Sequence, residues 1–185
     1  MVEKLIQEMR GRMEKSLDIL EGELYRIRTG RANPALIEDV KISYYGTLTV
    51  LKHLATITAP DPDQLVVRPY DPSQKEAIKR GLLEANLGLN PQAEEGLVRI
   101  KIPKLSEERR RELVKLVKEK GEEAKVAIRN IRRDTKELLE KMEKGGELPE
   151  DELYSQLEEL NKITHEYTGR IDGLIADKEE QILAV

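Results

Sequence analysis

Apolar residues recur at steps of three and four in three long stretches of this 185-residue chain, and this spacing constrains its fold more than any other feature. Alternating steps of three and four keep residues on one face of an α-helix, because the helix has 3.6 residues per turn. The stretches run from Val2 to Ile27, from Leu113 to Met142 and from Leu153 to Leu174. We therefore expect three long amphipathic helices that pack as an antiparallel bundle.

Glycine and proline residues mark where these helices should stop. Gly30 can adopt the left-handed conformation that follows a helix, and Pro34 cannot continue one, so the first helix is predicted to end at Thr29. The pair Gly145–Gly146, followed by Pro149, should end the second helix in the same way. At the start of that second helix, Ser106 has the position and the side chain of an N-cap.

Between the first and second helices the apolar spacing changes to a period near two, which is typical of β-strands. Strands are predicted at residues 40–44, 54–60, 65–69 and 97–102, and a short helix after Asp71. Ser73 and Glu76 have the spacing of a capping box at the start of this helix, and Gly88 and Pro91 should close it. Residues 30–105 are therefore predicted to form a compact unit of strands around one helix.

The predicted fold class is α+β, with a small β/α/β domain at 30–105 inserted into a three-helix bundle made of residues 1–29 and 106–185. Two short connections join the two parts. The residues at these connections are Gly30, Arg31, Ala32, Pro103, Lys104 and Leu105. Two parallel connections can act as a hinge or as rigid turns, and the residues alone leave both interpretations open.

Composition excludes several functional classes. The chain has no Cys, which removes disulfides, thiolate catalysis and thiolate metal sites. No apolar run approaches the roughly 18 residues of a membrane span, and the amino terminus lacks a signal-peptide core. We expect a soluble cytoplasmic protein without a membrane partner.

The net charge of −4 is unevenly distributed along the chain. Residues 106–145 carry thirteen basic and ten acidic side chains, whereas residues 146–185 carry three basic and eleven acidic ones. Nearly all the acidity thus lies in the last segment. A local basic surface can exist on an acidic protein of this kind.

A basic row follows the second predicted helix. Its members are Lys125, Arg129, Arg132 and Lys136, and it continues backwards through Lys118, Lys115 and Arg111 with Glu122 as the one acid. At 1.5 Å per residue the row extends for about 38 Å. The neighbouring apolar seam is expected to contain Ala124, Ile128, Ile131, Thr135 and Leu138. Such a row can bind nucleic acid or can be a solvated helix face, and both interpretations remain open here.

No catalytic or metal-binding arrangement is recognisable. His53 and His165 fall in different predicted domains, and neither has another His or Cys at metal-ligand spacing. The glycines form no phosphate-binding loop, and no serine lies in a nucleophile elbow. We therefore expect a binding protein without enzymatic activity, cofactor or metal.

Five motifs carry a resemblance to a known family. They are TGRANP (29–34), YYG (44–46), LGLNP (87–91), IPKLSEERR (102–110) and AIRNIRR (127–133). In this order and spacing they resemble the bacterial ribosome recycling factor family over essentially the whole chain. Where the family usually has two prolines after Tyr45-Gly-Thr47, this chain has Leu48 and Val50.

The resemblance implies a monomer shaped like an L of transfer-RNA dimensions. It also implies a function: binding to the large-subunit RNA of the post-termination ribosome and, with elongation factor G and GTP, splitting the ribosome into subunits. The RNA-binding residues that it implies here, together with Lys125 of the basic row, are Arg28, Arg31, Arg129, Arg132 and Arg133.

The sequence disfavours two other functional classes. A helical scaffold or chaperone-like adaptor would expose apolar residues on the outer helical faces, whereas these faces are predicted to be charged. An enzyme with its active site in the inserted domain would need an acid, a base or a nucleophile in a recognisable arrangement, and the sequence offers none.

Overall fold

The computed structural model describes residues 1–184, and in it the chain divides into two compact units. One unit combines residues 1–27 with the residues from 111 onward, and the other contains residues 28–110. The first is helical and the second contains the sheets, so the predicted α+β class, with a small domain inserted into a helical bundle, is confirmed.

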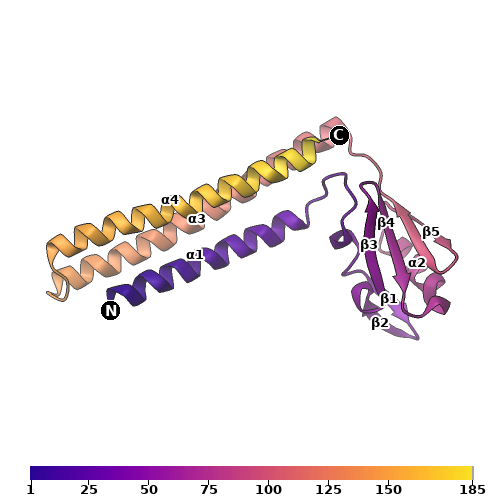
Figure 1. Ribbon diagram of the computed structural model, residues 1–185, viewed down its shortest axis with the longest axis horizontal. Helices are drawn as coiled ribbons and strands as arrows, with labels where there is room; N and C mark the ends of the chain where they lie inside the picture. The colour runs from indigo at the N-terminus through magenta and orange to yellow at the C-terminus, as the bar shows by residue number, and fades with distance from the viewer. Residues whose placement is uncertain (185) are drawn as a thin grey trace. The chain divides into compact units, whose positions relative to one another are not determined.

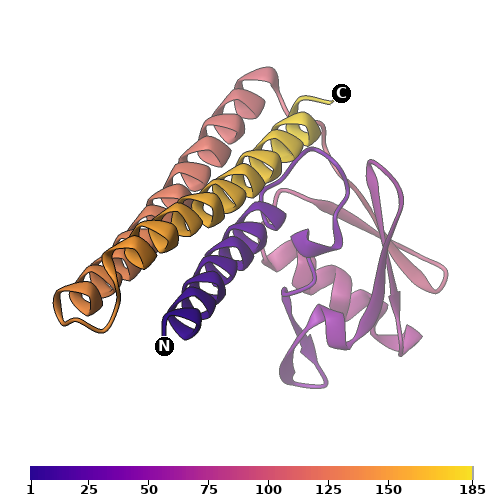
Figure 2. The same cartoon turned by 60° about the vertical axis from the view of Figure 1, so that its left-hand side comes forward.

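The larger unit is a three-helix bundle of α1 (Val2–Tyr25), α3 (Glu107–Lys144) and α4 (Glu150–Leu183). The three helices lie side by side in both views (Figure 1 and Figure 2). Ion pairs give their directions: Arg12 of α1 pairs with Asp134 of α3, and Glu23 pairs with Lys120. Because the residue numbers rise on α1 while they fall on α3, these two helices are antiparallel.

The apolar seams form most of the core of the bundle as predicted, and a clear difference lies on α3. Leu139 is fully buried, whereas Leu138 is 44% exposed, so the assignment of Leu138 to the core was wrong. A seam with steps averaging 3.5 drifts relative to a helix of 3.6 residues per turn. A step of four from the buried Thr135 to Leu139 corrects this drift.

The predicted end of the first helix was also wrong. Helix α1 ends at Tyr25, and the Ile27 N–H then donates to the Leu24 carbonyl over a shorter, three-residue step. Gly30 does have a positive φ of 77°, but it lies in the connecting segment beyond the helix. From residue 28 the chain already belongs to the smaller unit, so these residues leave the helix to enter it.

The turn between α3 and α4 follows the sequence prediction. Helix α3 ends at Lys144, and Gly146 adopts a positive φ of 76° that few other residues tolerate. The Glu147 N–H donates to the Met142 carbonyl, which satisfies one of the acceptors at the helix end. Pro149 then precedes α4 as its N-cap residue.

The smaller unit contains two antiparallel sheets and helix α2 (Lys75–Glu84). A hairpin pairs β1 (Lys41–Tyr44) with β2 (Thr47–Val50). The larger sheet has the order β3 (Ala55–Asp61), β4 (Gln64–Pro69), β6 (Leu97–Lys101) and β5 (Asn90–Glu94). Helix α2 packs against β1, β5 and β6, over a core of Ile42, Leu65, Ile78, Leu82, Val98 and Ile100.

Two short strands were not predicted from the sequence, and each pairs with a neighbouring strand that was predicted. Strand β2 follows a two-residue turn in which Tyr45 and Gly46 both have positive φ, the geometry that directs a chain back along the preceding strand. Strand β5 contains Pro91, which was taken only as a helix terminator. Because β5 is at the edge of its sheet, the missing N–H of proline is tolerated there.

The start of α2 differs from the predicted capping box. The Asp71 carboxylate accepts hydrogen bonds from the Ser73 N–H at 3.1 Å and the Ser73 hydroxyl at 2.7 Å. Ser73 therefore donates to Asp71 instead of accepting at the helix end. It lies in a short 3₁₀ turn (Pro72–Gln74), and α2 begins only at Lys75.

Two polar side chains of α4 hold Glu14 of α1. Arg170 donates to the Glu14 carboxylate from Nη1 and Nη2, each at 2.8 Å, and the Tyr167 hydroxyl donates to it at 2.9 Å. The Arg170 guanidinium also lies 5.2 Å from the centre of the Tyr167 ring. The hydrogen bonds from Arg170, and next those from Tyr167, hold the pKa of Glu14 below its ordinary value.

A first prediction concerns the close approach of α3 to α4 at the buried Gly121. A Cβ added there would lie 2.7 Å from Ile175 Cγ1, closer than van der Waals contact allows. Overpacking costs about 1–3 kcal/mol and the gain in helix propensity is about 1 kcal/mol, so Gly121→Ala should lower the free energy of unfolding by about 1 kcal/mol. Urea denaturation measures this change.

The control is Gly22→Ala on α1, where a Cβ would meet no atom within 4 Å. This variant gains helix propensity without overpacking and should be about 0.5–1 kcal/mol more stable than the parent chain. If both variants were stabilised equally, the tight contact at Gly121 would be contradicted.

A second prediction concerns Glu14 and pH. Glu14→Gln should lower the melting temperature at neutral pH, because the charge-assisted hydrogen bonds from Arg170 are lost. The folded-state pKa of Glu14 lies below the unfolded value of 4.5. The stabilisation is therefore complete above that value and is lost as pH falls through the folded-state pKa.

Melting curves recorded from about pH 7 to about pH 3 should thus show the Glu14→Gln and parent proteins converging in acid. Glu8→Gln on the same helix is the control, since Glu8 is exposed and has no partner among residues 1–184. A difference in melting temperature that stays constant with pH would show that the Glu14 carboxylate is not the group responsible.

Candidate nucleic-acid interface

Helix α3 carries the basic row that the sequence predicts. The helix begins where the Ser106 hydroxyl accepts a hydrogen bond from the Arg109 N–H at 3.2 Å, so the predicted cap is confirmed. Its buried side, which includes Val117, Ile128 and Leu139, faces the other two helices. The basic residues therefore lie on the flank towards α4 and on the outer face of the bundle.

The flank of α3 towards α4 is not free. Three basic residues spaced seven apart are each held by a polar side chain of α4: Lys118 by Glu179, Lys125 by Asp172 and Arg132 by Asn161. A spacing of seven returns to nearly the same side of a helix, so these contacts form one ladder along the α3–α4 contact. The acidic last helix thus neutralises part of the basic row.

The hydrogen bond that Lys125 donates to the Asp172 carboxylate, more than any other interaction, raises the pKa of Lys125, and partial burial of Lys125 opposes that change. Lys125 therefore remains protonated and paired on the flank of α3. Lys136 is also engaged, because it pairs with Glu140 one turn further along α3. Neither residue offers a full unpaired charge to a ligand.

Arg129 and Arg133 differ from the rest of the row. Both are exposed, and neither has a hydrogen bond or ion pair with any residue in the described part of the chain. They are four residues apart and so lie one turn apart on the same outer face of α3. Half-buried Arg132 lies between them in sequence, on the flank.

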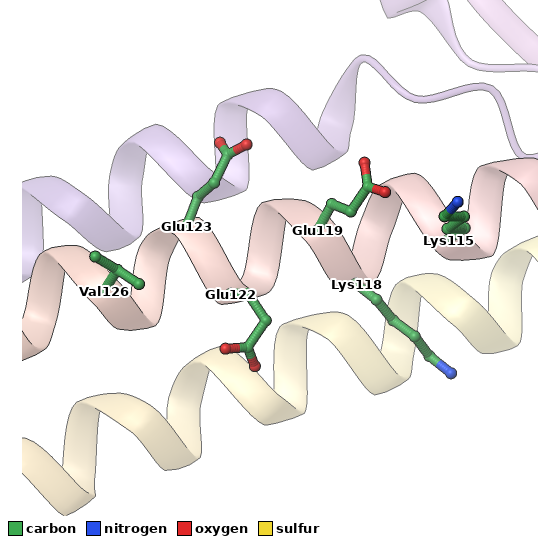
Figure 3. Close-up of a pocket in the computed structure, with 6 residues that line it drawn as sticks. All are labelled: Lys115, Lys118, Glu119, Glu122, Glu123 and Val126. Atoms are coloured by element: carbon green, nitrogen blue, oxygen red, sulfur yellow. The ribbon is translucent and has the colours of Figure 1, made fainter.

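Towards the start of α3 from Arg129, the outer face of the helix has a shallow depression of about 670 Å³. Its lining side chains, shown in Figure 3, are Lys115, Lys118, Glu119, Glu122, Glu123 and Val126. Lys118 and Glu122 extend on the side of α4, whereas Glu119 and Glu123 extend on the side of α1. One helix supplies every lining residue, so the depression is an open surface without walls to enclose a small ligand.

The other predicted site residues lie in the smaller unit. Arg28 is half-buried and Arg31 is exposed, and both belong to the segment that follows α1. The predicted hinge residues fall in two segments without helix or strand. Gly30 and Leu105 lie close to each other, since a Cβ at Gly30 would lie 3.4 Å from Leu105 Cγ.

Both connecting segments are anchored at the turn between β3 and β4. The Ala32 N–H donates to the Pro62 carbonyl at 2.6 Å, and the Ile102 N–H donates to the Asp63 carbonyl at 2.7 Å. These bonds fix the end of each connection within the smaller unit. Residues 28–31 and 103–106, which lie outside them, have no regular secondary structure to restrain their backbone.

Sequence reasoning missed the α4 residues that hold the basic row, namely Asn161, Asp172 and Glu179. A signal was present, because steps of eleven and seven place all three on one side of α4. Their significance appears only when this side is matched to Lys118, Lys125 and Arg132 on the antiparallel helix.

Residues 1–184 offer little support for a metal site or a membrane-spanning helix. No group of three or more His, Cys, Asp or Glu side chains there is placed to hold a metal ion. His53 and His165 are both exposed. Within the same residues, no helix has the length and apolar character needed to cross a membrane.

Comparison with known proteins gives a consistent result. Residues 20–183 match the family model described as ribosome recycling factor. The chain is 45% identical over 182 residues to the ribosome-recycling factor of Bacillus licheniformis, covering 98% of each chain. It is 44% identical over 185 residues to that of Bacillus subtilis (strain 168), covering all of both chains.

Two solved structures resemble the fold. One is the solution structure of a ribosome recycling factor, with a TM-score of 0.77, 38% identity and coverage of 100% of this chain and 98% of that one. The other, with a TM-score of 0.68, 44% identity and full coverage of both chains, comes from models of the Thermus thermophilus ribosome recycling factor and Escherichia coli elongation factor G bound to the E. coli post-termination complex.

Proposed function

This chain belongs to the ribosome recycling factor family, and from this premise we propose that it binds the post-termination ribosome and, with elongation factor G and GTP, splits it into subunits. The observation that carries the binding step is the exposed pair Arg129 and Arg133 on α3, which have no partner among residues 1–184, with Arg132 beside them. These three guanidinium groups form the surface that contacts large-subunit RNA.

Arginine suits this role because its planar guanidinium can hold a phosphate through two parallel hydrogen bonds, whereas lysine offers a point charge. The chain has no Trp or Phe to stack on bases. Recognition therefore depends on the RNA backbone and its shape. Arg28 and Arg31 contribute further phosphate contacts from the segment after α1, and Lys125 contributes a positive charge that is partly offset by Asp172.

The protein supplies binding and elongation factor G supplies the chemistry. Neither a nucleotide-binding loop nor an acid–base pair is recognisable in the sequence, so GTP is hydrolysed on the partner and this chain is not an enzyme. It acts in the cytoplasm as a monomer without cofactor. Exposed charged residues outnumber the exposed large apolar residues of α3, which are Leu116, Val126 and Leu138, and this favours the proposed function over a scaffold for apolar protein clients.

The connections between the units act as a hinge through which the ribosome-bound protein transmits movement. The unstructured residues 28–31 and 103–106 provide the flexible segments, and the contact of Gly30 with Leu105 keeps the two connections adjacent. Adjacent connections allow rotation about a single axis.

A third prediction tests the RNA-binding surface. The double variant Arg129→Ala, Arg133→Ala should fold normally, since neither side chain has an intramolecular partner in the described chain. Losing two phosphate contacts should weaken ribosome binding about a hundredfold and reduce the salt dependence of the affinity by about two in the log–log slope. Light scattering of post-termination ribosomes with elongation factor G and GTP measures the resulting loss of splitting.

The matched control is Lys4→Ala, Lys15→Ala, which removes from α1 two exposed charges that have no partner in the described part of the chain. It has the same change in net charge, so any general electrostatic effect appears in both variants. Equal behaviour of the two double variants would refute a specific role for the α3 arginines.

A fourth prediction tests the hinge. The chain has no Cys, so one cysteine introduced on the exposed surface of each unit gives a unique pair for cross-linking. A short, rigid cross-linker should abolish splitting while ribosome binding persists, because interdomain rotation is blocked. A long, flexible cross-linker at the same two cysteines is the control and should leave splitting intact. Full splitting by the rigidly linked protein would exclude a required hinge movement.

A further inference from the structure

The ladder between α3 and α4 uses two kinds of partner. At two rungs a lysine meets a carboxylate: Lys118 meets Glu179, and Lys125 meets Asp172. At the third rung Arg132 meets the neutral amide of Asn161. A carboxylate cancels most of the positive charge that it faces, whereas an amide oxygen accepts hydrogen bonds and leaves that charge in place.

The hydrogen bonds of Arg132 also leave one end of its guanidinium available. Asn161 Oδ1 accepts from Nε at 3.0 Å and from Nη2 at 2.7 Å. A guanidinium has five N–H donors, and these two bonds use one edge of it. Nη1 has no acceptor among residues 1–184, so the end formed by Nη1 and Nη2 can still hold a phosphate through two hydrogen bonds.

We propose that Asn161 is a positioning residue for RNA binding: it fixes the plane of Arg132 without neutralising it and so confines the phosphate-binding surface of α3 to residues 129–133. This inference rests on the proposed function. Lys118 and Lys125, which the sequence places in the same basic row, contribute less because α4 supplies their counter-charges.

Pre-organisation is the physical gain from this arrangement. A free arginine side chain loses rotamer entropy when a ligand orders it. Asn161 already orders Arg132 in the free protein, so less of that entropy is lost on binding. Exposed Arg129 and Arg133 have no such restraint in the described chain.

A fifth prediction uses Asn161→Asp, which is nearly isosteric and adds one negative charge. The new carboxylate should hold Arg132 at least as firmly while cancelling its charge, so the stability of the bundle should not fall. Affinity for isolated large ribosomal subunits should fall about tenfold. The salt slope, which is the slope of log affinity against log salt concentration, should become shallower by about one. A purely structural role for Asn161 would leave the salt slope unchanged.

Two further variants complete the design. Asn161→Ala removes the restraint but keeps the charge of Arg132, so affinity should fall about threefold with the salt slope preserved. Asp172→Asn converts the Lys125 rung into the amide type and should bind the subunits at least as tightly as the parent chain, with a steeper salt slope.

The outcomes separate this inference from the function on which it rests. If Asn161→Asp binds with parental affinity and salt slope while Arg129→Ala, Arg133→Ala is impaired, the role of Asn161 is refuted and the RNA-binding function stands. If neither variant changes binding, the assignment of RNA binding to α3 fails as well.

Discussion

The packing of three apolar seams into one core is the constraint on which the rest of the bundle depends. Burying each seam fixes the rotation of its helix about its own axis, which decides the residues that line each flank. On α3 this rotation places Lys125 and Arg132 towards α4, and leaves Arg129 and Arg133 on the outer face. The charge pattern that a ligand meets is therefore a consequence of core packing, although no charged member of the row belongs to the core.

Much of the fold could be predicted because its signals are local. Seams, a helix stop at Gly146 and a cap at Ser106 each depend on a few adjacent residues. Strands β2 and β5 were missed because each has only four or five residues, and their pairing with β1 and β6 is what identifies them as strands. The early end of α1 depends likewise on the entry of residue 28 into the smaller unit.

The site was predictable only in part, because it too depends on contacts between segments that are far apart in the sequence. Segregation of charge along α3 identifies a basic row, but which members remain available depends on a helix that lies far away in sequence. Asn161 is one of three amide side chains on the acidic α4, and its spacing from Asp172 and Glu179 gains meaning only when Arg132 is known to lie opposite it. Lys178 is similarly unexpected: it is 7% exposed in the core of the bundle, and burial lowers its pKa. Lys178 lies seven residues after the buried Ile171, and this spacing predicts that it is buried. A charged lysine side chain would instead be expected at the surface.

The acidic α4 also resolves the apparent conflict between a net charge of −4 and an RNA partner. A fully available basic row of about 38 Å would attract many RNA helices through counterion release, which carries no specificity. Glu179 and Asp172 offset Lys118 and Lys125, whereas Arg129, Arg132 and Arg133, which span little more than one helical turn, face no carboxylate of α4 in the described chain. Binding through so short a surface requires phosphates in a particular arrangement. We therefore infer that Asp172 and Glu179 contribute specificity, because they neutralise lysines that would otherwise attract RNA of any sequence or shape.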